Sequence, residues 1–99
     1  MNLLPGAYRV AASTRRAGPI AVELKLEPVS EEQEYGTIAR WLKREGDHVD
    51  VGEVVVEVEA EKVTQEVEAP VSGVLQSIIA VDGDEVRVGD VIAVIEESP

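Results

Sequence analysis

The sequence predicts an all-β domain, a flattened barrel or sandwich of two four-stranded sheets that a pseudo-twofold axis relates. Apolar Ile, Val and Leu residues alternate with polar ones, and turn signals recur about every 8–12 residues. The segment 36–59 also aligns with the segment 73–96 at a constant offset of 37, without a gap. A repeated unit this short cannot bury its apolar face alone, so we expect the two copies to face each other.

The repeat is clearest at turns and at apolar positions. Gly46 and Asp47 of the first copy return as Gly83 and Asp84 in the second. Further identical pairs are Gly36 and Gly73, Val49 and Val86, Val51 and Val88, Gly52 and Gly89, Val54 and Val91, and Glu59 and Glu96. The repeat leaves one stretch unexplained, the connection centred on Lys62.

Each expected strand follows from its alternation of apolar and polar side chains. In the third strand, for example, Val54, Val56 and Val58 are expected to point inward. We expect strands at 20–26, 36–42, 54–59, 63–69, 74–80 and 91–96. Glycine-containing or polar segments predict a loop at 28–34 and turns or bends at 44–47, 49–53, 70–73, 82–84 and 86–90. No segment predicts a helix.

Composition argues against several classes of function. Cysteine is absent, which excludes disulfides and thiolate sites, and His48 is the single histidine and is assigned no role. The aromatic residues Tyr8, Tyr35 and Trp41 are too few for base stacking, and Trp41 is expected to serve local packing. A net charge of −11 repels phosphate backbones. We therefore expect no nucleic acid as a partner. No apolar run is long enough to span a bilayer, so we expect no membrane partner either.

Charge also divides the chain. Residues 1–22 contain three arginines and no acidic residue, whereas residues 23–99 contain all 20 acidic residues. We expect residues 1–19 to be a flexible N-terminal arm, either an unstructured extension or, less well supported, an organelle transit peptide. Residues 20–97 form the expected domain, monomeric in isolation, and residues 98–99 are a tail or the start of a linker. The acidic body favours partners with a basic face.

Around Lys62 the sequence predicts a β-hairpin. If Glu61 and Lys62 are the two loop residues, Ala60 faces Val63, and the pairing continues to Val56 opposite Val67. Glu-Lys is poor material for the primed turns that two-residue hairpins favour, so we expect a type I turn with some local splay. The same register places two like charges, Glu57 and Glu66, side by side, which is unfavourable in a ladder.

A lysine at such a tip has no structural duty, and Lys62 is therefore a candidate for covalent attachment of a group. Most surface lysines are solubilising charges, but here the repeat and the hairpin single one out. Glu59 and Glu61 are either solvated strand residues or recognition residues. At the offset of 37, Lys62 corresponds to Pro99, so we expect the tip and the chain end at opposite poles.

Four stretches form a familiar pattern: Gly-Thr-Ile-Ala-Arg-Trp-Leu-Lys-Arg-Glu-Gly-Asp-His-Val at 36–49, Val-Gly-Glu at 51–53, Glu-Val-Glu-Ala-Glu-Lys at 57–62 and Ala-Pro-Val-Ser-Gly-Val-Leu at 69–75. Together they closely resemble the lipoyl domains of dihydrolipoamide acyltransferases in 2-oxo acid dehydrogenase complexes. The resemblance covers about residues 20–97. It implies the barrel-sandwich fold and places Lys62 where that family carries lipoic acid in amide linkage.

The resemblance implies a swinging-arm carrier without catalytic residues of its own. Its implied partners are a lipoyl ligase or lipoyltransferase, a thiamine-diphosphate dehydrogenase, an acyltransferase catalytic domain and dihydrolipoamide dehydrogenase. The dithiolane on Lys62 would be reductively acylated, would pass the acyl group to coenzyme A, and would then be reoxidised by the flavoprotein. The chain departs from the usual Asp-Lys-Ala turn, because Glu61 replaces the Asp and Val63 the Ala. The resemblance thereby makes Val63 a further candidate for recognition by the lipoylating enzyme.

Three alternatives stay open beside the lipoyl carrier. A biotin carrier has a similar fold, but its lysine lies between two methionines, whereas Met1 is the single methionine here. The glycine-cleavage H protein resembles the hairpin but is longer and has terminal helices. An unmodified domain could instead serve as a structural or protein-binding module. For location, the bacterial or archaeal cytoplasm is preferred over the mitochondrial matrix.

Overall fold

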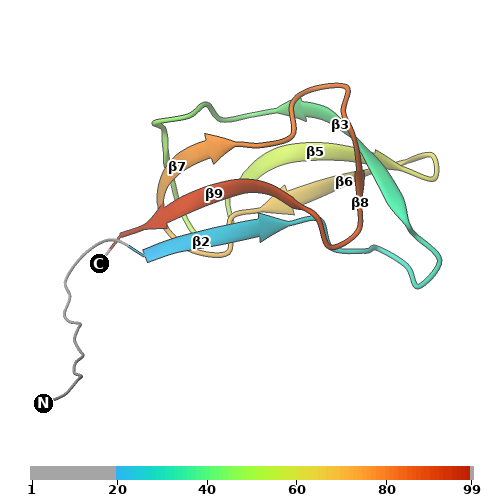
Figure 1. The fold of residues 1–99 in the computed structure, drawn as a ribbon, viewed down its shortest axis with the longest axis horizontal. Coiled ribbons are helices and arrows are strands. Elements are labelled where there is room, and N and C mark those ends of the chain that lie inside the picture. Colours follow the sequence, from blue (N-terminus) through green and yellow to red (C-terminus); the bar gives the residue numbers. More distant parts are fainter. Residues whose placement is uncertain (1–19, 99) are drawn as a thin grey trace, which may run out of the picture.

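The protein folds into two antiparallel sheets made of eight strands (Figure 1). The computed structural model describes residues 20–98, so the expected arm at 1–19 lies outside the described residues. The strands are β2 (Ile20–Lys25), β3 (Tyr35–Trp41), β4 (His48–Val49), β5 (Val54–Ala60), β6 (Val63–Glu68), β7 (Gly73–Ile78), β8 (Glu85–Arg87) and β9 (Val91–Glu97).

The two sheets have matching strand orders. One sheet runs β2-β9-β7-β4 and the other β6-β5-β3-β8, which confirms the prediction of an all-β fold with two four-stranded sheets. Residues 20–98 contain no helix, and hence none that could cross a membrane. Superimposing one order on the other pairs β2 with β6, β9 with β5, β7 with β3 and β4 with β8 as twins.

Hydrogen bonds confirm the pseudo-twofold relation atom by atom. The N–H of Gly46 donates to the Leu75 carbonyl at 2.7 Å, and its twin Gly83 donates to the Ile38 carbonyl at the same distance. The turns match as well: the carboxylate of Asp47 accepts from the N–H of Arg44, as Asp84 accepts from Val81. The strand irregularities after Ile38 and Leu75 are also twins. Both copies of the repeat therefore form the same structure.

The two short strands, β4 and β8, fall in segments for which the sequence predicted turns and bends. Each pairs with a strand of the other repeat: Val49 lies opposite Gly73, and Val86 opposite Gly36. Two or three residues are too few to show an alternation of apolar and polar side chains. Each short strand forms because it pairs with a longer strand instead. These pairs join one copy of the repeat to the other.

The core lies between the sheets and consists mainly of aliphatic side chains from both copies. Its largest fully buried members are Leu26, Ile38, Leu75, Ile92, Ile95, Val49, Val55, Val56 and Val58. The inward positions predicted for Val56 and Val58 are confirmed, but Val54 is only half-buried and Val55 is fully buried. The register shifts between Val54 and Val56, and this bulge turns two consecutive valines inward.

Gly73 lies where β7 leaves no room for a side chain beside β9. A Cβ on Gly73 would overlap the carbonyl oxygen of Glu96 and lie 2.9 Å from its carbon, and both atoms belong to the backbone of β9. At the twin position Gly36, a Cβ would meet the Val58 Cγ1 at 2.6 Å. A side-chain methyl can move aside, whereas a paired strand cannot, so the two glycines differ in how replaceable they are.

We predict that Gly73→Ala lowers the free energy of unfolding by about 2–4 kcal/mol, because β7 and β9 must separate to admit the methyl group. Gly36→Ala is the matched comparison and should lose less, since the Val58 side chain can rotate. Urea unfolding of both variants measures the difference. Equal losses, or a larger loss for Gly36→Ala, would contradict this account of the two contacts.

Glu53 stabilises the bend that leads into β5. The N–H of Asp50 donates to its carboxylate at 3.0 Å, and Lys43 Nζ lies 3.2 Å from the other oxygen. These hydrogen bonds, first from Asp50 and then from Lys43, hold the pKa of the Glu53 carboxyl below its ordinary value of 4.5. A lowered pKa means that the stabilisation is present above the unfolded-state pKa and is lost as pH falls through the folded-state pKa.

We predict that Glu53→Gln is less stable than the parent protein at neutral pH and that this difference shrinks as pH falls below 4.5. The amide keeps an acceptor for Asp50 but loses the attraction to Lys43. Urea unfolding across this pH range measures the effect. A stability difference that does not change with pH would show that the charge of Glu53 has no part in it.

Candidate attachment site at the hairpin tip

Lys62 lies at the tip of the β5–β6 hairpin, which projects from one end of the molecule (Figure 1). The predicted register is confirmed throughout, from Ala60 opposite Val63 to Val56 opposite Val67. The end of β9 lies at the other end of the molecule, as the repeat predicted for the tip and the chain end. The Lys62 amine is thus carried far from the point where the chain leaves the domain.

The turn itself differs from the prediction. Glu61 and Lys62 have φ angles of 50° and 72°, and they are the two non-glycine residues with positive φ within residues 20–98. Two consecutive positive values are typical of a type I′ turn, so the expectation of a splayed type I turn is wrong. The primed turn matches the right-handed twist of β5 and β6, and this tertiary constraint outweighs the poor propensity of Glu-Lys.

The Lys62 side chain is exposed to solvent. Within residues 20–98, no ion pair or side-chain hydrogen bond involves it. The tip forms a hollow lined by residues 59–64, which include Lys62. The Lys62 amine is therefore free to react with a group brought by another protein.

The three residues proposed for recognition surround the lysine. Glu59 is exposed on β5, opposite Thr64, and Glu61 is exposed in the turn. Val63 is 51% exposed, whereas its cross-strand partner Ala60 is buried. The structure brings these side chains together around Lys62, and their part in recognition stays a prediction.

The like charges expected at Glu57 and Glu66 are indeed opposite each other. Arg40 on the neighbouring strand β3 lies on the other side of Glu57, with 3.1 Å between its Nε and the Glu57 Oε1. The sequence did not predict this neighbour of the two like charges. The Arg40 guanidinium supplies a counter-charge on the exposed face of the sheet, although a surface pair of this kind contributes little.

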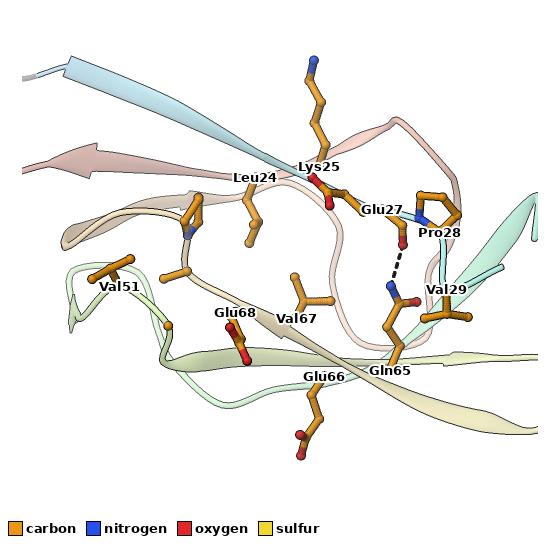
Figure 2. Close-up of a pocket in the computed structure, with 13 residues that line it drawn as sticks. Leu24, Lys25, Glu27, Pro28, Val29, Val51, Gln65, Glu66, Val67 and Glu68 are labelled. Carbon is orange, nitrogen blue, oxygen red and sulfur yellow. Dashed lines mark hydrogen bonds between the residues drawn. The ribbon is translucent and has the colours of Figure 1, made fainter. Parts of the chain in front are cut away.

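A pair of glutamines near the hairpin was missed in the sequence. Gln33 is 5% exposed, and its Nε2 lies 3.4 Å from the Gln65 Oε1. The Gln65 Nε2 donates in turn to the Glu27 carbonyl at 2.5 Å, across the groove between β2 and β6 (Figure 2). The signal was present, because the predicted register sets polar Gln65 opposite inward-facing Val58.

Trp41 has the packing role that the sequence predicted, and His48 was assigned no role. Trp41 packs against the core and its Nε1 donates to the Ala80 carbonyl at 2.7 Å. His48 lies on β4, not in a turn, and its exposed ring is 2.9 Å from Asp50 Oδ1. Residues 20–98 contain no cluster of three potential metal ligands.

An amide-linked prosthetic group fits this site. An amide needs an accessible amine, and Lys62 offers one with no competing ion pair in residues 20–98. The hollow is open to solvent on one side and is flanked by the exposed residues Glu59 and Glu61. The arrangement can present a tethered group to other proteins, but its geometry does not provide an enclosed pocket for a reaction.

Comparison with known proteins agrees with this geometry. A family model of biotin and lipoyl attachment, described as biotin-requiring enzyme, matches residues 22–95. The chain belongs to the biotin/lipoyl attachment family. A solved lipoyl domain of the 2-oxoglutarate dehydrogenase complex from Azotobacter vinelandii is 32% identical, with a TM-score of 0.62, and the match covers 84% of this chain and 100% of that one. The chain is therefore a lipoyl domain in fold and sequence.

Curated relatives are components of the same complexes. The dihydrolipoyllysine-residue succinyltransferase component of the 2-oxoglutarate dehydrogenase complex from Staphylococcus saprophyticus is 49% identical over 75 residues, and that from Bacillus subtilis is 45% identical. Each match covers 76% of this chain and 18% of the relative. The lipoyl domain thus spans about a fifth of the length of these relatives, and the resemblance to acyltransferase lipoyl domains is confirmed.

Left-handed backbone at Glu61 is unfavourable for most side chains, whereas Asn tolerates it because its short polar side chain can hydrogen-bond locally. We predict that Glu61→Asn raises the free energy of unfolding by up to about 1 kcal/mol. The matched control is Glu31→Asn, which makes the same change at an exposed loop residue without positive φ. Urea unfolding of the two variants measures the difference, and no gain at Glu61 beyond the gain at Glu31 would contradict strain in the turn.

Proposed function

We propose that this lipoyl domain carries lipoic acid in amide linkage on Lys62 and serves as a non-catalytic swinging-arm carrier in a 2-oxo acid dehydrogenase complex. The observation that carries the proposal is the exposed amine of Lys62 at the apex of a hairpin whose turn is held in a left-handed conformation. Membership of the family and the likeness to acyltransferase components support it.

Attachment is simple in chemical terms. The bond that forms joins Lys62 Nζ to the carboxyl carbon of an activated lipoate, the activating group leaves, and the ammonium gives up two protons. A lipoyl ligase or lipoyltransferase must supply the activated acid, since the described residues offer no site for that step. When bound, the lipoyl group supplies a disulfide that accepts an acyl group together with two electrons.

The domain's contribution is to position and to tether. A group on Lys62 would be exposed at the end of the molecule opposite the last residue of β9. Tethering replaces free diffusion between the active sites by a local search at high effective concentration. The proposed partners are the thiamine-diphosphate dehydrogenase, the acyltransferase domain and dihydrolipoamide dehydrogenase, and the proposed location is the cytoplasm or, as the alternative, the mitochondrial matrix.

Biotin on Lys62 is the second candidate. The matching family is described as biotin-requiring enzyme, and the Kluyveromyces lactis urea carboxylase contains a region with a TM-score of 0.67 and 31% identity. That match covers 84% of this chain but 7% of the carboxylase. The flanking residues Glu61 and Val63 favour lipoate, since biotin carriers resemble this hairpin but place methionines there.

We predict that coexpression with a lipoyl ligase and lipoate adds one lipoyl amide per chain, detected by intact mass, and that Lys62→Arg abolishes the adduct. The chain has two other lysines, so Lys25→Arg serves as a matched control, because that side chain is also exposed, at 54%. It should be modified as fully as the parent protein.

Coexpression with a biotin ligase and biotin forms the second arm of the experiment. A biotin adduct lost in Lys62→Arg would replace lipoate by biotin and keep the site. An adduct that survives in Lys62→Arg would refute attachment at Lys62, and no adduct under either condition would leave the interaction module as the function.

A further inference from the structure

The connection between β2 and β3 is longer than the fold requires. It contains nine residues, 26–34, whereas its twin between β6 and β7 contains four, 69–72. Backbone hydrogen bonds to the connection between β8 and β9 fix both of its ends. The N–H of Leu26 donates to the Asp90 carbonyl, and the N–H of Val88 donates to the Glu34 carbonyl. The intervening acidic segment, residues 27–34, is called the glutamine-linked loop below. It lies at the same end of the molecule as the hairpin tip (Figure 1).

Two glutamines hold the interior of this loop against the attachment hairpin. The Gln33 Oε1 accepts the N–H of Val29 at 2.7 Å, and its Nε2 lies 3.3 Å from the Tyr35 carbonyl and 3.4 Å from the Gln65 Oε1. The Gln65 Nε2 then donates to the Glu27 carbonyl at 2.5 Å (Figure 2). Gln33 is the one buried polar side chain in residues 20–98, and its amide is fully engaged.

The pseudo-twofold shows that packing does not demand Gln65. Gln65 pairs with Val58 on β5, and the twin pair is Val22 with Ile95. A valine therefore satisfies the same inward position in the other sheet. The polar side chain at 65 does something that the sheet does not need, and the bond it makes joins the loop to β6.

The position of this bond relates it to the attachment site. Gln65 is three residues from Lys62 along β6, a separation of roughly 10 Å at strand spacing. The loop is thus tied to the hairpin a few residues from the tip. An enzyme that places the Lys62 amine in its active site has to accommodate both.

We propose that Gln33 and Gln65 are positioning residues, which fix the glutamine-linked loop beside the hairpin so that the enzyme attaching lipoate to Lys62 meets a preformed surface. The inference rests on the proposed function and adds a second element to the recognition of the tip. A preformed loop lowers the ordering that binding would otherwise require, so the linkage acts on substrate affinity and not on the chemical step.

Gln65→Val tests the proposal, because it installs the residue found at the twin position. The Glu27 carbonyl belongs to an exposed residue and can turn to water, so the domain should fold. Amide hydrogen exchange within 27–34 should speed about tenfold, as one or two lost hydrogen bonds would allow. The KM of a lipoyl ligase for the unmodified domain should rise about threefold to tenfold with kcat unchanged, since binding must now order the loop.

Gln76→Val is the matched control, the same change at an exposed position on β7, and it should leave both readouts at the parent values. Gln65→Glu is an isosteric second variant, which cannot donate to Glu27 and should loosen the loop even if the valine variant fails to fold. Unchanged exchange in the loop overturns the proposal, and so does a loosened loop with unchanged KM. Failure of the proposed function shows separately, as a parent domain that accepts no lipoate.

Discussion

The two-residue turn between β5 and β6 is the constraint on which the proposed attachment site depends. Positive φ at both Glu61 and Lys62 keeps the strands in register to the last pair, Ala60 with Val63. In a longer or less ordered turn, the position of the lysine would no longer be fixed by the paired strands. The left-handed backbone is unfavourable for both side chains by about 1–2 kcal/mol each, so the paired strands must supply the difference. The lysine is thus presented at a fixed point by a backbone that its own sequence would not choose.

The pseudo-twofold separates what folding needs from what function needs. Where twin positions carry the same residue, as at Gly46 and Gly83, the fold requires that residue. Where the twin residues differ, the fold is compatible with both. On the outer face of the hairpin sheet, Glu57 stands at the position that Val94 occupies in the other sheet. The internal repeat therefore serves as a control that a single domain without symmetry would lack.

Sequence patterns predicted most of the body because local signals and symmetry agreed. The repeat predicted two equivalent sheets, and the placement of Glu61 and Lys62 in the turn predicted the hairpin register. Three features depend on contacts between distant segments and escaped prediction. Strand β4 exists because Val49 meets Gly73, Val55 is buried because of a bulge, and Gln33 meets Gln65 across 32 positions of sequence. The turn at Glu61 was mispredicted because propensity was weighed without the twist of the strands it joins.

Charge fits the same division between body and site. At the hairpin end, acidic side chains lie on β5, in the turn and in the glutamine-linked loop. Of these, Glu57 is partly neutralised by Arg40. Surface carboxylates at this density repel a second copy of the domain and attract a basic partner, with a range set by salt. A carrier benefits from both effects, because it must visit several proteins in turn and must not hold on to itself. Exposed Lys62 at the centre of this field is the one part of the tip that carries the opposite charge, and acylation of its amine would remove that charge and leave the whole end of the domain negative.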